Sequence, residues 1–246
     1  MSKEQKVQRI KAWLAITVIL IMCMVAGMVM IKYEVEGETN MPFELSSITV
    51  ISTAEGVQTQ EATTRWSLDL VQNNDIYISI ENNENHQEED TIKSVSIQNL
   101  QIVESPKVGT IRCYMPQSED GSIFAFREKY LFQENLTFKG ASKTNMKNLE
   151  IGSQGGTIVF RIADAQIGQF LSDADDEIKH DGTILTKANL TQEDLQCKIA
   201  FDLMIEVRHT TYKTHIVLDL PTGNIIEEGT CTWEKIDFSD TVFKRI

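Results

Sequence analysis

The chain has 246 residues, of which 24% are charged, and its formal net charge is −13. The imbalance grows beyond residue 33, where 18 Lys and Arg stand against 35 Asp and Glu, a net charge of −17. Phosphate groups would repel such an acidic surface, which argues against nucleic-acid binding and against adhesion of this part to anionic lipid headgroups.

Residues 12–31 form an uncharged apolar stretch in which Thr17 is the only polar side chain. At about 1.5 Å rise per residue, these residues would cover the roughly 30 Å hydrocarbon core of a bilayer as one helix. A cleaved secretory signal peptide is the alternative, but its apolar region is shorter and ends at a small-x-small site. Here the best such site, Val25-Ala26-Gly27, lies inside the apolar run. The sequence therefore predicts an uncleaved transmembrane helix.

The flanking charges predict the orientation of this helix. Four Lys and Arg precede the apolar stretch, against the single acidic residue Glu4, whereas acidic residues dominate after it. Because an excess of Lys and Arg stays in the cytoplasm, we expect residues 1–11 to be a cytoplasmic tail. Residues 12–31 then span the membrane, 32–42 form a juxtamembrane linker, and 43–246 form one domain outside the cytoplasm.

Residues 43–246 contain no low-complexity linker and no internal repeat, which favours a single domain. Their dominant pattern is the alternation of apolar and polar residues that is typical of strands with one buried face. The first strand is expected at 43–53. A hairpin is expected next, because even-numbered positions are apolar at 66–70 and again at 76–80, on either side of Gln72-Asn73-Asn74. A three-residue loop with Asn74 in the left-handed conformation would join its strands.

Residues 82–90 are polar and acidic and are expected to form a loop. In the strand after this loop the apolar positions are odd-numbered up to Ile97 and even-numbered from Leu100. A change of parity inside one strand indicates a β-bulge, here at Gln98-Asn99. Further strands are expected at 109–115, 123–132, 135–139, 157–163 and 230–238, and a strand-connecting turn is expected at 152–156.

The clearest alternation lies at 199–220. Apolar residues are odd-numbered up to Val207 and even-numbered from Tyr212, so an even-length loop must join two strands that share a buried face. Thr210-Thr211 lack the Gly or Asn of a primed two-residue turn, which favours a four-residue loop. A two-residue loop at Thr210-Thr211 would set Asp202 opposite Asp219, an unfavourable pair unless a cation or a register shift intervenes.

Helical signal beyond the apolar stretch is scant, and only residues 191–194, with Thr191 and Asp194 at their ends, indicate a capped single turn. About ten short strands separated by turns predict an all-β domain. The expected fold is therefore a β-sandwich or jelly-roll-like domain, mainly antiparallel, preceded by one N-terminal transmembrane helix.

Candidate metal ligands gather at residues 173–181, where the carboxylates Asp173, Asp175, Glu177 and Asp181 alternate with other residues. Calcium takes six to eight oxygen ligands and suits such a loop. However, Ile178 stands where an EF-hand loop needs glycine, so a solvated acidic loop is the favoured interpretation.

Three cysteines lie outside the apolar stretch, Cys113, Cys197 and Cys231. Their long, irregular spacing fits one disulfide with a free thiol as well as three buried thiols, and the sequence does not choose between these arrangements.

The sequence contains no nucleophile elbow, zinc-protease helix, Walker loop or dinucleotide-binding turn. We therefore expect a single-pass, signal-anchored cell-membrane protein that is not an enzyme and needs no cofactor. Its extracytoplasmic domain would bind an envelope protein or a glycan, or serve as a structural component of the cell envelope. The alternative is a membrane-tethered carbohydrate-binding module, supported by calcium, in which exposed aromatic rings such as Trp233 stack on sugars.

Overall fold

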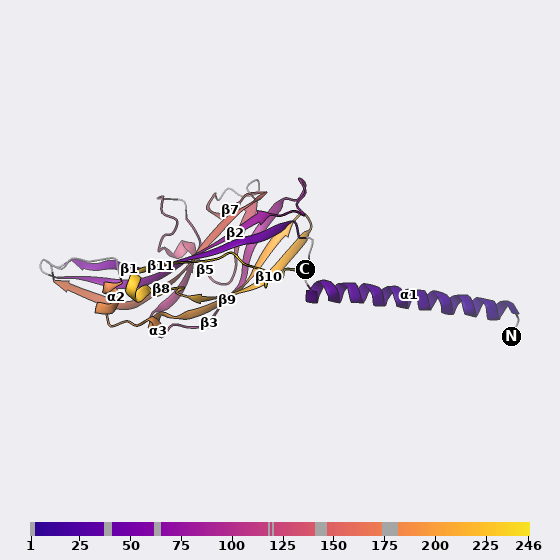
Figure 1. Cartoon of the computed structure of the whole chain (residues 1–246), viewed down its shortest axis with the longest axis horizontal. Coiled ribbons are helices and arrows are strands. Elements are labelled where there is room, and N and C mark those ends of the chain that lie inside the picture. Colours follow the sequence, from indigo (N-terminus) through magenta and orange to yellow (C-terminus); the bar gives the residue numbers. More distant parts are fainter. Residues whose placement is uncertain are drawn as a thin grey trace.

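The computed structural model describes residues 3–36, 41–61, 65–117, 119, 121–140, 147–173 and 182–246. A long helix, α1 (Lys3–Glu36), extends away from an elongated body built mainly of strands (Figure 1). The window Lys11–Ile31 of this helix has a mean hydropathy of 2.8, and none of it is buried against the rest of the chain. The predicted apolar helix is thus confirmed, and it is long and apolar enough to cross a membrane.

Sheet A has six strands in the order β11-β1-β2-β8-β4-β5. Their bounds are Thr230–Lys235 (β11), Phe43–Glu61 (β1), Arg65–Asn82 (β2), Gly155–Asp173 (β8), Thr110–Tyr114 (β4) and Leu131–Phe132 (β5). All neighbouring strands of this sheet are antiparallel.

Sheet B also has six strands, in the order β12-β10-β9-β3-β6-β7. Their bounds are Lys244–Arg245 (β12), Thr210–Leu220 (β10), Cys197–Val207 (β9), Ile92–Glu104 (β3), Leu136–Gly140 (β6) and Glu150–Ile151 (β7). Only the short β6–β7 pair is parallel. Two mainly antiparallel sheets form a β-sandwich, as the alternating pattern predicts.

The interior contains two large hydrophobic clusters. The main cluster fills the space between the sheets near α1, with Phe160 of sheet A edge-to-face against Phe201 of sheet B at 5.6 Å between ring centroids. The distal cluster lies further along β1, β2 and β8, with Leu70 at its centre. Three short helices contribute to it: α2 (Thr183–Lys187), α3 (Gln192–Leu195) and α4 (Ile225–Glu228). Because β1, β2 and β8 run through both clusters, one set of strands joins the two halves of the body.

The hairpin predicted at 66–80 is wrong, because β2 runs without interruption from Arg65 to Asn82. The triplet Gln72-Asn73-Asn74 lies in the middle of this strand and pairs with β1 on one side and β8 on the other. Its side chains are completely buried. The even-numbered apolar positions before and after the triplet therefore belong to one face of one long strand.

The hairpin at 199–220 is confirmed, but its loop has two residues, not four. Val207 pairs with Thr210, so Arg208 and His209 form the turn. Arg208 takes the left-handed conformation, with φ of 53°, although it is neither Gly nor Asn. In this register Asp219 lies opposite Lys198, and the unfavourable Asp202–Asp219 pair does not arise.

Other local predictions have mixed outcomes. The β-bulge is confirmed, since the β3–β9 register shifts between Gln98 and Gln101 and Asn99 has φ of 53°. The capped turn is confirmed too, because the Thr191 backbone N–H donates to Asp194 Oδ2 at 2.9 Å. The strand predicted at 123–132 is mostly wrong. Only Leu131–Phe132 pairs as a strand, after a 3-10 turn at Glu128–Tyr130.

The described residues of the 115–130 segment instead cover the outer face of sheet A. Phe124 and Tyr130 of this segment pack with Tyr114 of β4, Val71 of β2 and Ala163 of β8 in a third, smaller hydrophobic cluster. The predicted turn at 152–156 joins β7 to β8, and a second 3-10 turn at Lys147–Leu149 precedes β7.

Candidate functional site

A buried polar layer separates the two large hydrophobic clusters. It consists of Ser52 on β1, Gln72 and Asn74 on β2, and Asp164 on β8, each at most 1% exposed. The strand register places these residues side by side, since Ser52 pairs with Asn74 and Gln72 pairs with Asp164. Buried polar groups destabilise a fold unless they are hydrogen-bonded, so the partners of each group decide what this layer does.

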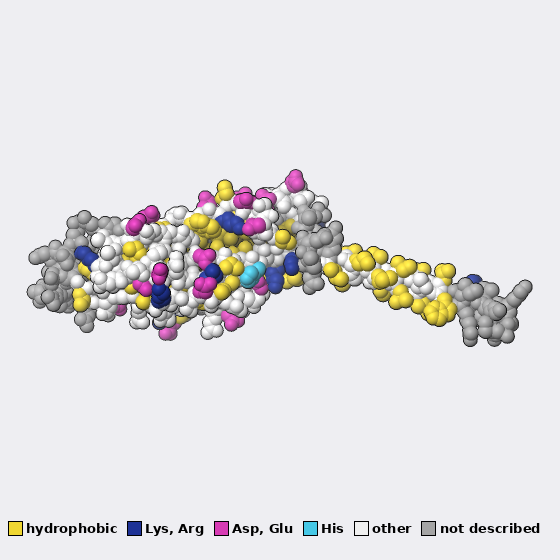
Figure 2. Space-filling view, turned by 60° about the horizontal axis from the view of Figure 1, so that its bottom comes forward, with side chains coloured by type: hydrophobic (Ala, Val, Ile, Leu, Met, Phe, Trp, Pro, Cys, Tyr) yellow, Lys and Arg dark blue, Asp and Glu magenta, His cyan; other side chains and the backbone are white. Residues whose placement is uncertain are grey.

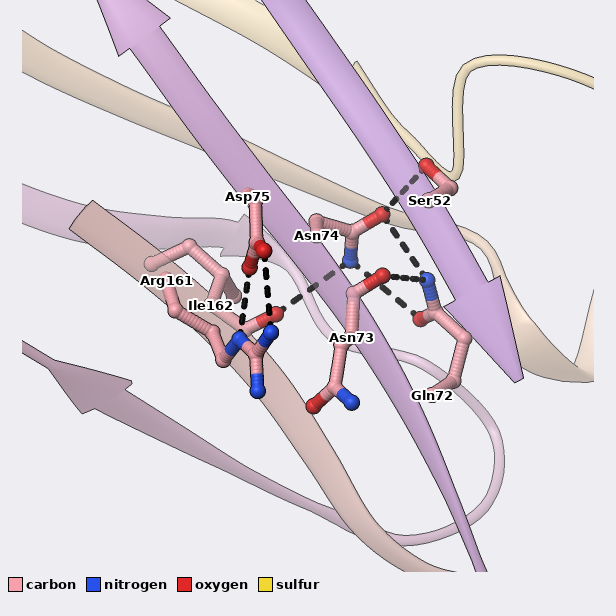
Figure 3. A network of polar contacts seen from close by, with 7 residues as sticks. All are labelled: Ser52, Gln72, Asn73, Asn74, Asp75, Arg161 and Ile162. Atoms are coloured by element: carbon pink, nitrogen blue, oxygen red, sulfur yellow. Dashed lines mark hydrogen bonds and ion pairs between the residues drawn. The ribbon is translucent and has the colours of Figure 1, made fainter. Parts of the chain in front are cut away.

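Most of the layer is satisfied internally (Figure 3). The Ser52 hydroxyl donates to Asn74 Oδ1 at 2.7 Å, and Gln72 Nε2 donates to the same oxygen at 2.8 Å. Asn74 Nδ2 donates in turn to Gln72 Oε1 and to the backbone carbonyl of Ile162 on β8. These bonds connect β1, β2 and β8 at one level of sheet A, so they fix the register of the three long strands.

Asp164 is the exception in this layer. Neither of its carboxylate oxygens has a hydrogen-bond partner of regular geometry. Burial raises the pKa of this carboxyl from 3.8 to about 7, and the nearby backbone amide of Thr110 opposes the rise only weakly. Gly109 approaches so closely that a Cβ there would lie 2.0 Å from Asp164 Oδ1. The carboxyl is therefore an enclosed, readily protonated acid.

The opposite face of β2 carries an ion pair beneath the 115–130 segment. Arg161 of β8 binds Asp75 of β2 through two hydrogen bonds, with Nη2 donating at 2.9 Å and Nε donating to the other oxygen (Figure 3). Its guanidinium lies 4.6 Å from the ring centroid of Phe124 and 5.6 Å from that of Phe126. The pair therefore attaches the covering segment to sheet A.

A second polar cluster lies on the outer face of sheet B. Asp202 of β9 accepts hydrogen bonds from Asn99 Nδ2 at 2.8 Å and from Lys213 Nζ at 3.3 Å, and lies 3.0 Å from His215 Nδ1. The hydrogen bonds from His215, Asn99 and Lys213 hold the pKa of this carboxyl below its usual range, although partial burial opposes them and is the largest single influence. The imidazole of His215 is 62% exposed. Bulk water therefore surrounds the free side of this Asp–His pair.

A hollow of about 640 Å³ lies next to this cluster, between the edges of the two sheets. Its apolar wall includes Ile216 and Leu218 of β10, Trp233 of β11, and Phe238 of the C-terminal segment. Charged side chains of both signs surround it: the basic Lys213, Lys235 and Lys244, and the acidic Asp202 and Asp240. In Figure 2 hydrophobic side chains lie exposed among charged ones on the half of the body nearer to α1. We call this hollow the edge groove.

A second hollow, of about 560 Å³, lies on the other side of the C-terminal segment and shares Phe238 with the edge groove. Its lining comes from the start of β1, including Phe43 and Leu45, and from the 236–243 segment. The C-terminal segment thus crosses the open side of the sandwich with space on both of its sides.

The predicted calcium ligands stay a prediction, because they lie outside what the structure describes. Asp173 ends β8 but its side chain is outside the described part, and Asp175, Glu177 and Asp181 lie outside the described residues. Among the residues that are described, no group of three or more His, Cys, Asp or Glu is placed to hold a metal ion. All four cysteines are free thiols, with Cys197 and Cys231 buried and Cys113 half-buried.

Sequence reasoning missed both the polar layer and the edge groove. The polar triplet of β2 was the visible signal for the first, but it was interpreted as a turn. These features define the class of protein, a β-sandwich with an apolar helix of membrane-spanning length at its N-terminal end. Comparison with family models, curated proteins and solved structures finds no match to this chain.

Proposed function

We propose that this chain is a single-pass membrane protein that holds a β-sandwich outside the cytoplasm as a binding module or structural component of the cell envelope. The observation that carries the proposal is the exposure of α1, whose apolar Lys11–Ile31 window is not buried against the rest of the chain. An apolar helix of this length is stable when lipid covers it. The basic residues before it favour a cytoplasmic N-terminus.

The titratable groups of the body support binding or a structural role over catalysis. Asp202 and His215 lie on an open sheet face, where water screens their charges. Asp164 is only 1% exposed, so its carboxyl is not presented at the surface. The edge groove, by contrast, combines an apolar wall with basic side chains, as a binding surface does.

The carbohydrate-binding alternative draws no support from a specific observation. Trp233 is half-buried and packs against the main cluster. Among the body residues whose side-chain exposure the structure describes, Phe126 is the one Phe, Tyr or Trp that is exposed. Its ring contacts Arg161 and Tyr114 within the chain.

Topology tests the proposal directly. An alkaline phosphatase fused after Ile246 should be active, a fluorescent protein that folds only in the cytoplasm should be dark at the same position, and the mature protein should keep its N-terminus. Changing the basic residues before residue 12 to Glu should reduce the correctly oriented fraction. An inactive phosphatase, or a mature chain that begins after residue 27, would contradict the anchored topology.

A further inference from the structure

The edge of β10 that borders the groove is unpaired by any described strand beyond Lys213. β10 pairs with β9 along its whole length, but β12 covers its other edge only at Tyr212 and Lys213. The backbone N–H of Ile246 donates to the Thr211 carbonyl at 2.9 Å, so Thr211 directs its carbonyl toward this free edge. Because backbone groups alternate along a strand, His215, Val217 and Asp219 direct theirs to the same side, where no described strand pairs with them.

The edge of sheet A that faces the groove is also open. β11 pairs only with β1, and its inward-facing Trp233 lies in the wall of the groove. Ile216 and Leu218 contribute the facing wall from β10. The sandwich thus has an apolar space between two unpaired edges, which is the space that one further strand would fill with alternate side chains.

Charge selects what kind of strand fits. The body is strongly acidic, yet Lys213, His215, Lys235 and Lys244 all line this one groove. Asp202 and Asp240 neutralise Lys213 and Lys235, whereas Lys244 is exposed and makes no ion pair with any described residue. The uncompensated charge therefore lies at the β12 end of the groove. Acidic side chains there would gain attraction, and basic ones would be repelled.

We propose that the edge groove binds an extended acidic polypeptide, which adds a strand to β10 alongside residues 215–219. Its inward side chains are apolar and contact Ile216, Leu218 and Trp233, and its acidic side chains lie near Lys244 and His215. This assignment rests on the proposed binding function and names its site and partner chemistry. The proposed partner is a separate polypeptide that supplies the acidic side chains facing Lys244.

The test measures fluorescence anisotropy of a short fluorescein-labelled peptide in which Glu and Val alternate, titrated with the full chain in neutral detergent micelles. Val217 is half exposed, and its backbone N–H is directed to the free edge of β10. Val217→Pro therefore removes this N–H and keeps the hydrogen bonds between β10 and β9. It should raise the Kd about tenfold or more, whereas Val217→Thr keeps the amide and should change it little. Lys244→Glu should raise the Kd about fivefold, and the matched control Arg112→Glu, on sheet A, should not.

Strand addition also predicts slower hydrogen exchange at the amides of 215–219 when the peptide is bound, which attraction by charge alone would not produce. Equal affinity for a peptide with the same residues grouped in blocks, or unchanged exchange at 215–219, would overturn the proposal. If the chain self-associates, excess peptide does not reverse this, and Val217→Pro abolishes it, then the β10 edge binds a second copy of the chain instead. The topology assay uses no peptide, so failure of the proposed function and failure of this proposal are distinguishable. An inverted chain would give an inactive phosphatase fusion, whereas a groove that binds no peptide would leave the phosphatase active.

Discussion

Replacing Asp164 with Asn should make the body more stable at neutral and alkaline pH. Below about pH 3.8 the folded and unfolded chains both carry the protonated acid. As the pH rises to about 7, the unfolded chain ionises while the folded chain keeps its proton, so the free energy of unfolding falls. Above about pH 7 the whole loss is present. At 1.36 kcal/mol per pH unit it amounts to about 4 kcal/mol.

Asn cannot ionise, so Asp164→Asn removes this loss with little change of shape. Between about pH 5 and pH 8 the free energy of unfolding of the wild-type chain should fall by about 3 kcal/mol relative to that of the variant. For a domain of this size that corresponds to roughly 6–12 °C in Tm. Thermal melts of both full chains in neutral detergent, followed by far-UV circular dichroism at the two pH values, measure the difference.

The matched control is Asp219→Asn, which changes a carboxyl that is 81% exposed. Its effect should stay within about 0.5 kcal/mol at both pH values. If the difference in Tm between wild type and Asp164→Asn does not widen as the pH rises, the Asp164 carboxyl is hydrated or hydrogen-bonded in the folded chain. Asp164 would then not be an enclosed acid without a partner.

Three further predictions follow from the same structure. Residues 34–246, expressed without the anchor, should melt in one cooperative transition because β1, β2 and β8 join both clusters; two separated transitions would refute a single domain. Millimolar calcium should leave the Tm of this domain unchanged. A cation bound at a concentration 100 times its Kd would add about 2.7 kcal/mol to the free energy of unfolding, so a rise in Tm that Asp175→Asn with Glu177→Gln abolishes would support the calcium loop. Maleimide should modify Cys113, Cys197 and Cys231 slowly in the folded chain and fast in denaturant, because burial raises their pKa values to about 11, 12 and 11. Mass spectrometry at early times of labelling measures the rates, and immediate reaction of any of the three in the folded chain would contradict the prediction.

The sequence predicted the parts of the fold where local chemistry and tertiary packing agree. The alternation at 199–220 predicted β9 and β10 with the correct buried faces, because a strand register is dictated by the side that must be buried. The change of parity near Asn99 predicted the bulge for the same reason. The turn between β9 and β10 was predicted incorrectly because Arg208 adopts a conformation that turn statistics reserve for Gly and Asn.

The sequence did not reveal where polarity is buried. Gln72-Asn73-Asn74 has the composition of a turn. Inside the sandwich Gln72 and Asn74 bond to each other, and Asn74 also bonds to Ser52 and Ile162, which are distant in sequence. The edge groove was equally hidden, because its walls come from β10, β11 and the C-terminal segment. Such features depend on which strands become neighbours, and alternation along one strand does not contain that information.

The three long strands also determine how the body would carry a pulling force. β1 follows α1 along the chain and is hydrogen-bonded on both sides, to β2 and to β11. With 18 residues at about 3.3 Å each, β2 reaches roughly 60 Å from one end of the body to the other. Force applied to opposite ends of neighbouring long strands would load many ladder hydrogen bonds at once, so these bonds would have to break together. Such a body is suited to remain folded when it is pulled along its long axis.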